Sequence, residues 1–518
     1  MPLPLALLLA CHPAGTPGVD DPQVDDTAPV DSPTDTHDSP VDTSDSVETP
    51  VEWSWLHGVW NAKLAYTDPF AYESVASVPF RFVVSGDVIS ATSGSVTYDV
   101  TTTEDPQTVT LHVEAGGPEQ DGGSYTYVED IVLTERADDD TLVGVYAESR
   151  HVYDADGDEL FGEESVAFAE FGRVDRIDAT PTQGLTLLGS AIPTNNGEYA
   201  VNVRVQDGYA YLPHYADGLF IYDVRDPAAI TLVGTSPAGS GDWNDVKLYA
   251  SDERTYAMVA SSTDGLVVVD VTDPTAPVVV NALPGVGGMV HTLAIEGTTA
   301  YLATLGSRGR GGGLVTVDIT DPASPVVLGE WLAAEAGGSF VHDLFIDDGI
   351  AYLCAWEGGL VLVDVTDPTN LQRIAQVEYD PGNMTSHSVW VTDAPGRKVA
   401  LEGGEGWGTH LRIIDVDPTS ADYLQVIGEL ALPEQVSIHN IMMGSGTTAV
   451  VAWYQYGVRL VDISDPTQPT MVGWAQQWDP EDPRNGAGYY EGAVGVDVVD
   501  DKVYVADIWD DLLVYGVE

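Results

Sequence analysis

The clearest pattern in the chain is a short apolar run that recurs from about residue 178 onward. Each run begins with Gly-Leu or a close variant, continues through Val, Leu and Ile, and ends in an Asp-Pro pair, as in 265–274 and 359–368. The aspartate of that pair falls at positions 226, 273, 321, 367, 417 and 465, which is a period of about 48 residues. Near-continuous apolar runs are typical of strands that are buried on both faces.

Each period has room for four short strands, for example 342–346, 350–354, 359–365 and 371–379. Four antiparallel strands in 40–50 residues form the blade of a β-propeller. Residues 178–518 hold about seven such periods, so we expect an all-β, seven-bladed propeller. The segment 185–190 matches what would follow the last run, so we expect it to close the seventh blade and remove its free edge.

These runs, with their Leu-Val-Val-Val-Asp core, resemble the LVIVD-repeat family across residues 178–518. Members of that family are bacterial and archaeal surface or secreted propellers. The resemblance therefore implies a propeller that works outside the cytoplasm.

Before the propeller, residues 53–175 show short alternating strands separated by Gly and Asp clusters, for example 78–84 and 107–113. This pattern predicts a small antiparallel β-barrel or sandwich. Gly58-Val59-Trp60 resembles the Gly-X-Trp signature of lipocalin-like barrels, in which the tryptophan plugs one end of the barrel.

The first ten residues are apolar but too short to span a bilayer, and they fit the hydrophobic part of an export signal. Leu8-Leu9-Ala10-Cys11 resembles the lipobox of bacterial lipoproteins, which implies that Cys11 becomes the lipidated first residue. The alternative is an ordinary signal peptide with Ala-Cys present by chance. Residues 11–52 are rich in Asp, Thr, Ser and Pro and contain no Phe, Trp or Tyr, so we expect a disordered tether.

The net charge of the chain excludes one class of binding partner. The chain has 19 Lys and Arg against 82 Asp and Glu, a formal net charge of -63. Phosphate contacts need Lys and Arg, so nucleic acid is excluded as a partner. Residues 12–50 contribute only ten of the acidic groups, so the rest of the chain is strongly acidic as well. Adaptation to high salt and binding of calcium both explain such acidity, and composition does not separate them.

The repeated aspartates have two interpretations. A ring of carboxylates suits a cation, but an Asp before a Pro turn also accepts a backbone N–H in an Asx turn. Their identical placement in nearly every repeat favours the turn. The segment 154–159 alternates carboxylates as a calcium loop does, but Glu159 stands where such a loop needs glycine, and Asp-Gly also marks a hairpin.

Four histidines occupy one equivalent position, at the start of the presumed innermost strand of four successive blades: His291, His342, His387 and His439. Asn244 holds that position in the preceding blade. Innermost strands line the central channel, so these imidazoles are candidate ligands for zinc or another divalent metal, with Asp343 nearby in sequence. The alternative is that they cap strands and form hydrogen bonds within the blades.

Non-repeating loops supply the remaining candidate binding residues: Arg308, Arg310, Trp407, Trp478, Tyr489 and Tyr490. Loops on a rigid scaffold are common binding sites, and aromatic loops suit sugars or peptides. Loops that merely cover the propeller explain these residues equally well.

Together these features predict an outer-membrane-anchored lipoprotein, facing the periplasm or the cell surface, whose propeller binds a protein, glycan or small ligand without catalysis. We expect a monomer that contacts the membrane through its lipid. The alternatives are a secreted propeller hydrolase with a His-ligated metal in the channel and a purely structural envelope component.

Overall fold

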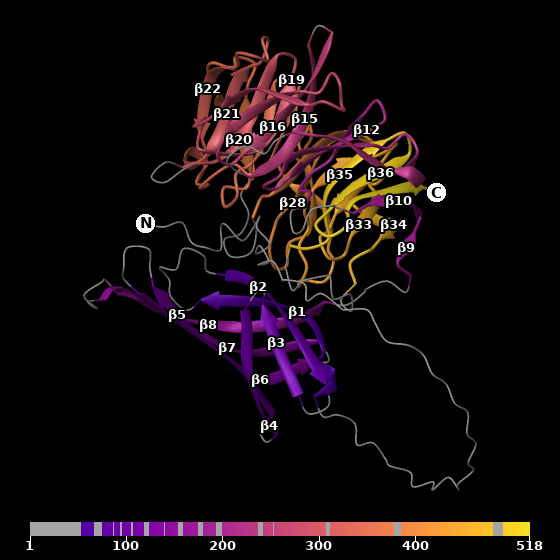
Figure 1. The fold of residues 1–518 in the computed structure, drawn as a ribbon. Coiled ribbons are helices and arrows are strands. Elements are labelled where there is room, and N and C mark those ends of the chain that lie inside the picture. The colour runs from indigo at the N-terminus through magenta and orange to yellow at the C-terminus, as the bar shows by residue number, and fades with distance from the viewer. Residues whose placement is uncertain are drawn as a thin grey trace, which may run out of the picture.

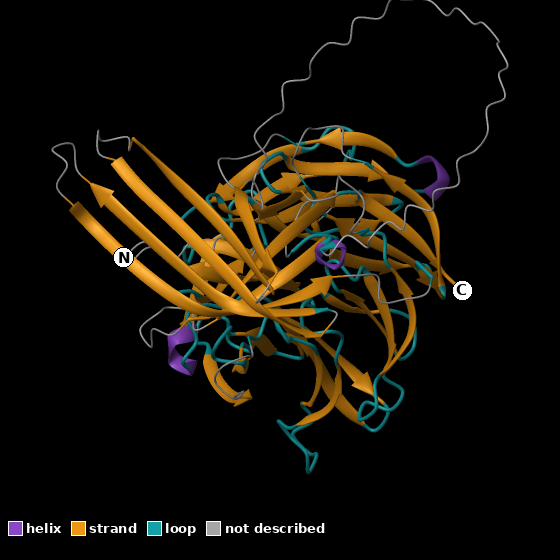
Figure 2. Ribbon diagram, turned by 90° about the horizontal axis from the view of Figure 1, so that it is seen from below, coloured by secondary structure: helices purple, strands orange, loops and turns teal. Residues whose placement is uncertain are grey.

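The computed structural model describes residues 53–518 with gaps at 67–74, 86–87, 94–95, 105–106, 119–123, 139, 154–158, 175–179, 193–198, 237–241, 252, 307–310, 378–384 and 480–489. Its described secondary structure is almost entirely β-strand, as Figure 2 shows from below. The helical turns are η1 (Ser54–Leu56), η2 (Pro227–Ala229) and η3 (Ala333–Ala336). No described helix is long and apolar enough to span a bilayer.

Eight antiparallel strands of the N-terminal part close into a barrel, because β1 pairs with both β2 and β8 (Figure 1). The alternating sequence pattern is compatible with both a barrel and a sandwich, and the structure shows a barrel. Its strands are β1 (Gly58–Tyr66), β2 (Val75–Ser85), β3 (Val88–Ser93), β4 (Val96–Glu104), β5 (Gln107–Pro118), β6 (Ser124–Asp138), β7 (Thr141–Tyr153) and β8 (Glu159–Val174).

Trp60 of β1 is fully buried in the barrel core. Its indole N–H donates to the carbonyl of Leu56 at 2.9 Å, and the guanidinium of Arg173 lies 4.4 Å from the ring centroid. The segment 154–158 lies outside the described residues, but Tyr153 and Glu159 on either side of it are paired, as a hairpin requires.

The rest of the chain forms seven antiparallel sheets, which are the blades of the predicted propeller. In the first six the innermost strand comes first. The strands are β11 (Arg204–Gln206), β12 (Tyr209–His214), β13 (Gly218–Asp223) and β14 (Thr231–Thr235) in blade 1; β15 (Trp243–Ser251), β16 (Arg254–Ser261), β17 (Gly265–Asp270) and β18 (Val278–Leu283) in blade 2; and β19 (Met289–Glu296), β20 (Thr299–Gly306), β21 (Gly313–Asp318) and β22 (Val326–Leu332) in blade 3.

Blades 4–7 continue the ring with β23 (Leu344–Asp347), β24 (Ile350–Cys354), β25 (Leu360–Asp364) and β26 (Gln372–Val377); β27 (Ser388–Ala394), β28 (Arg397–Gly403), β29 (Leu411–Asp415) and β30 (Val426–Leu430); β31 (Ile441–Met443), β32 (Thr448–Ala452), β33 (Val458–Asp462) and β34 (Thr470–Ala475); and β35 (Ala493–Val499), β36 (Lys502–Asp507) and β37 (Asp511–Val517). Each innermost strand contacts the innermost strand of the next blade, and β35 contacts β11. The ring is therefore closed.

The seventh blade is completed by the segment that precedes the first. Strand β10 (Leu185–Ala191) pairs antiparallel with β37, from Leu185 opposite Val517 to Ala191 opposite Leu512. This confirms the prediction that residues 185–190 close the last blade. The short strand β9 (Thr182–Gln183) pairs in the same way with β34 of blade 6.

The repeated aspartates act as turn residues, which was the favoured interpretation. The carboxylates of Asp270, Asp318 and Asp364 each accept a hydrogen bond from the backbone N–H two residues later, at 2.8–3.0 Å. Asp273 and Asp465, the aspartates before proline, do the same at 3.0 Å. The hydroxyls of Thr275 and Thr467 also donate to the carboxylates of Asp273 and Asp465, at 2.7 Å. These hydroxyl bonds, together with the backbone bonds, stabilise the ionised carboxylate and lower the pKa of both exposed aspartates.

The barrel contacts the propeller at blades 5 and 6. The amide of Asn61, which is fully buried, donates to the carbonyl of Gln435 at 2.6 Å and to Oε1 of Gln455 at 2.9 Å. The side chain of Gln435 donates in turn to the carbonyl of Arg173 at 2.7 Å. Val59 and Val174 pack into the same apolar cluster as the inner residues of these two blades.

Candidate functional site

The four histidines do occupy one structural position. The backbone N–H of His342 bonds the carbonyl of Cys354 at the end of the second strand, at 2.9 Å. His387 makes the equivalent bond to Gly403 and His439 to Ala452, at the same length. Because the same bond recurs in three blades, it holds the three side chains at equivalent places on the channel wall.

In the other blades this position is held by Val201, Asn244, His291 and Val494. Blades 2, 3 and 7 bulge there, since the strand pairing skips Asn244, His291 and Val494. A bulge redirects a side chain out of the regular pleat. Around the ring, the position therefore reads Val, Asn, His, His, His, His, Val.

The imidazole rings form a continuous arc. Ring centroids are 4.0 Å apart between His291 and His342, 4.0 Å between His342 and His387, and 4.6 Å between His387 and His439. His387 is 1% exposed and His342 is 3% exposed, while His439 is half-buried. The structure therefore brings the four candidate histidines together.

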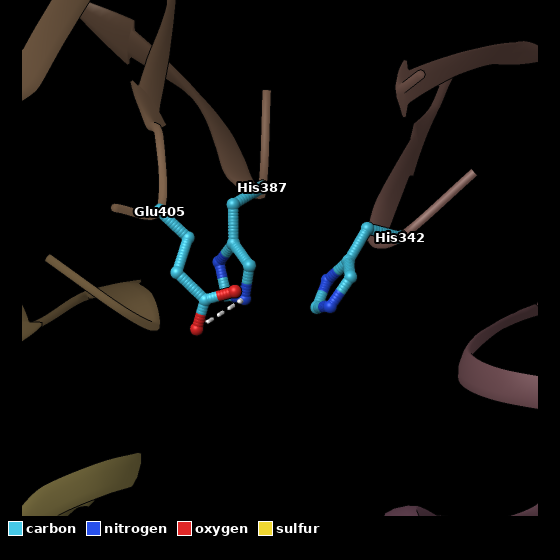
Figure 3. Close-up of side chains that lie close together, drawn as sticks. All are labelled: His342, His387 and Glu405. Atoms are coloured by element: carbon cyan, nitrogen blue, oxygen red, sulfur yellow. Dashed lines mark ion pairs between the residues drawn. The ribbon is translucent and has the colours of Figure 1, made fainter. Parts of the chain in front are cut away.

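Glu405 joins the arc from the loop after β28. Its Oε1 lies 3.7 Å from Nε2 of His387 and accepts a hydrogen bond of 2.5 Å from the hydroxyl of Tyr454. One ligand atom each of His342, His387 and Glu405 lie within 4.8 Å of one another (Figure 3). Figure 3 shows Glu405 beside His387, with the ring of His342 facing them from the neighbouring blade.

This cluster contains buried polar atoms without a hydrogen-bond partner. Both ring nitrogens of His387 and Oε2 of Glu405 have no hydrogen-bond partner, although buried polar atoms in proteins are nearly always hydrogen-bonded. Such orphaned atoms need an explanation, and an ion between them is one.

Burial also sets the protonation states. It lowers the pKa of His342 and His387 well below that of an ordinary imidazole, and the neighbouring histidines add to the effect. It lowers the pKa of His439 to about 4, against the hydrogen bond to the carbonyl of Val494. Burial raises the pKa of Glu405 to about 8, against the bond from Tyr454. At pH 7 these three imidazoles are therefore neutral, which is the form that binds metal, whereas Glu405 is largely protonated and would have to release its proton to a metal.

The donor set decides which ions fit. Two imidazoles and one carboxylate, with a further position open, are ligands of zinc and of other divalent transition metals. Calcium takes six to eight oxygen ligands, which this cluster does not offer. Zinc ligands in a tetrahedron lie roughly 3.4 Å apart, so the present spacing needs side-chain rotations that bring the atoms closer by up to about 1.4 Å.

A small pocket that is partly open to solvent lies beside the arc. His291, His342 and His439 line it directly, and Tyr454 connects it to Glu405. Its other lining residues are Tyr199, Val201, Asn202, Asn244, Thr292, Asp343, Asn440, Tyr490, Val494 and Ile508. A ligand in this cavity would lie next to a metal held by His342.

The predicted loop residues are not gathered at this cavity. Trp407 is 7% exposed, and its ring approaches Gly172 of the barrel. Trp478 is buried, and its indole N–H donates to Glu491 at 3.3 Å. Tyr490 does line the cavity, with its ring 5.3 Å from that of Tyr454. Arg308, Arg310, Tyr489 and Cys11 lie outside the described residues.

The sequence analysis did not select Glu405 as a ligand. The sequence does contain a signal for it. Glu405 stands two residues after Gly403, near the end of the second strand of blade 5. The residues at the same place in blades 4 and 6, two after Cys354 and Ala452, are Trp356 and Tyr454. A carboxylate where the neighbouring blades have aromatic rings marks blade 5 as different.

Comparison with known proteins supports the repeat assignment. The LVIVD repeat matches residues 197–236, 241–283, 287–332, 339–378 and 445–476. The chain thus carries LVIVD repeats arranged as a β-propeller. The fifth blade, with His387 and Glu405, is not among the matched segments.

Solved structures with a similar fold share little sequence with this chain. The WD40 β-propeller domain of Doa1 is 12% identical, over 65% of this chain and 98% of that one, with a TM-score of 0.46. A hypothetical selenium-binding protein from Sulfolobus tokodaii is 13% identical, over 64% and 84%, with a TM-score of 0.45. Raptor from Chaetomium thermophilum is 12% identical, over 64% and 28%, with a TM-score of 0.47. A search of curated proteins gave no match.

Proposed function

We propose that this protein is an exported envelope lipoprotein whose propeller binds ligands at its channel mouth, through a divalent transition metal held by His342, His387 and Glu405. One observation carries the metal site: three buried ligand groups converge, and two of them retain polar atoms with no hydrogen-bond partner. His291 and His439 flank the three, so either is a candidate for a fourth ligand.

The experiment is a zinc titration of the purified full chain by calorimetry, after chelator treatment. We expect one zinc per chain in the wild type and at least a hundredfold loss of affinity in His342→Ala and in His387→Ala. His410→Ala is the matched control, because His410 lies beside the same blade but faces Glu429. Equal zinc binding in wild type and both variants, or none in the wild type, would refute the site.

The envelope assignment rests on the sequence. The apolar start, the lipobox-like Leu8-Leu9-Ala10-Cys11 and the acidic, Pro-rich stretch after it are what a lipid-anchored, tethered protein needs. Expression in a bacterial host with labelled palmitate tests the anchor. We expect label in the wild type and its loss in Cys11→Ser, and label that survives this substitution would contradict the anchor.

A metal-dependent hydrolase is the second candidate function. The observation in its favour is the pocket against His342, since zinc with three protein ligands and a position open to substrate is typical of catalytic sites. A non-catalytic scaffold remains our first choice, because most other polar groups of the repeats form turns. Hydrolysis of model esters that requires zinc and His387 would favour the enzyme.

A further inference from the structure

The histidines of blades 4, 5 and 6 share a backbone setting that the fourth histidine of the arc lacks. His342, His387 and His439 each donate the backbone N–H to the end of the second strand of their own blade, at 2.9 Å. His291 stands on a bulge instead, because the pairing of β19 with β20 skips this residue. A bulge redirects the side chain that it carries. His439 is therefore placed as the two histidines assigned to the metal are, and His291 is not.

Glu405 lies on the side of His387 that faces blade 6. Its Oε1 lies 3.7 Å from Nε2 of His387 and accepts the hydroxyl of Tyr454, which belongs to the same blade as His439. The ring centroid of His439 lies 4.6 Å from that of Tyr454 and 4.6 Å from that of His387. His439 thus packs against both neighbours of the carboxylate, whereas His291 lies two blades away from His387.

The hydrogen bond of His439 leaves one of its ring nitrogens available to a metal. Nδ1 lies 2.6 Å from the carbonyl oxygen of Val494, and a carbonyl oxygen can only accept, so Nδ1 carries the hydrogen. A neutral imidazole has a single N–H, so Nε2 keeps its lone pair. Histidines that bind metals usually donate their other ring N–H to a carbonyl or carboxylate in this way. Blade 7 therefore holds His439 in the tautomer that a metal ligand needs.

We infer that His439 is the fourth protein ligand of the metal and that His291 stays outside the coordination set. This inference rests on the proposed metal site. Among the described residues, the 4.8 Å group of ligand atoms contains His342, His387 and Glu405 but not His439, so metal binding has to draw this ring toward His387. Once Glu405 has released its proton, zinc with one carboxylate and three neutral imidazoles carries one net positive charge.

This coordination set places the metal at the wall of the pocket. His342 and His439 line the pocket, while His387 and Glu405 are not among its described lining residues. A metal bound by all four side chains has His387 and Glu405 behind it and the pocket in front of it. Zinc can accept a fifth ligand. A ligand in the pocket therefore reaches the metal between His342 and His439.

The test replaces histidine by asparagine, which blade 2 already has at this position in Asn244. The asparagine amide can still donate to the carbonyl of Val494 but offers no nitrogen lone pair, so His439→Asn separates a ligand from a structural cap. Partners that only orient a ligand contribute about 10- to 100-fold to metal affinity, so we expect His439→Asn to lose about a hundredfold or more in zinc calorimetry on the full chain. His291→Asn is the matched control and should bind zinc as the wild type does.

X-ray absorption of the zinc-loaded wild type gives a readout that does not depend on the folding of a variant. We expect three imidazoles and one carboxylate around zinc, and two imidazoles would overturn the inference. Wild-type zinc affinity in His439→Asn, or an equal loss in His291→Asn, overturns it as well. If His342→Ala and His387→Ala lose zinc while His439→Asn keeps it, the metal site stands and only this inference fails. Failure of the wild type to bind zinc overturns both.

Discussion

The hydroxyl of Tyr454 in blade 6 donates a 2.5 Å hydrogen bond to Oε1 of Glu405 in blade 5. The bond crosses the boundary between two blades and fixes the carboxylate beside His387. Tyr454 itself has a left-handed backbone, with φ of 36°, and its carbonyl accepts a hydrogen bond from the backbone N–H of Ala493 in blade 7 at 3.1 Å. Three blades are thus tied together at the candidate metal ligand.

Tyr454→Phe removes this bond while keeping the ring contacts with His439 and Tyr490. Groups that orient metal ligands typically contribute 10- to 100-fold to affinity, so we expect zinc to bind about 10- to 100-fold more weakly. Zinc calorimetry measures the change, and Tyr423→Phe in an outer turn of blade 5 serves as the control. Unchanged affinity in Tyr454→Phe would mean that the bond does not orient Glu405.

Leu185→Ala tests ring closure. Leu185 of β10 is 1% exposed and packs with Leu513 and Tyr515 of the strand it pairs with. Replacing a buried leucine by alanine costs about 2–5 kcal/mol, and we expect the free energy of unfolding to fall by that amount in denaturant titrations.

Leu188→Ala, on the same strand but 37% exposed, should cost much less. If the two substitutions are equally mild, β10 is not needed to stabilise the seventh blade.

Asn61→Leu tests the contact between barrel and propeller. The substitution leaves the carbonyl of Gln435 and Oε1 of Gln455 without their donor, and an unsatisfied buried group costs about 1–3 kcal/mol. We expect lower stability and faster proteolysis between the two parts of the chain. Asn281→Leu, which breaks an exposed bond to Ala323, should have little effect. Identical cleavage in both variants would argue against a fixed contact.

Asp507→Asn should change how stability depends on pH. Burial raises the pKa of Asp507 to about 6, helped by nearby Asp510. A group whose pKa is higher in the folded than in the unfolded state stabilises the fold at low pH and loses that effect as pH rises through the folded value. The wild type should therefore lose on the order of 3 kcal/mol between about pH 4 and pH 8 from this group, and the variant should not.

Unfolding titrations at several pH values measure this difference. Asp207→Asn, on an exposed turn, should follow the wild-type curve. A curve for Asp507→Asn that runs parallel to that of the wild type would contradict the prediction.

The repeats explain why so much of the propeller was predictable. Six Asp-Pro turns at nearly equal spacing define the blade length, and blade length defines the number of blades in 341 residues. The same register placed His291, His342, His387 and His439 at one position before their convergence was visible. Ring closure followed because residues 185–190 resemble the strand missing from the last repeat.

Features without a repeat were not predictable in this way. Alternating apolar residues fit a barrel as well as a sandwich, since both bury one face of each strand. The contact of Asn61 with Gln435 joins residues 374 positions apart, and neither residue belongs to a pattern. Glu405 can be recognised as a candidate metal ligand only after the folded ring has placed other side chains, above all Tyr454, around it.

The docking of the barrel beside the arc has a consequence for communication between the two parts. Gln455, which accepts from barrel residue Asn61, is the chain neighbour of Tyr454, and Gln435 lies four residues before His439. Any movement of the barrel relative to blades 5 and 6 must therefore strain the segments that carry the candidate metal-site residues. Since linkage is reciprocal, a ligand bound at the arc that displaced these segments would be expected to alter the contact of the barrel with blades 5 and 6.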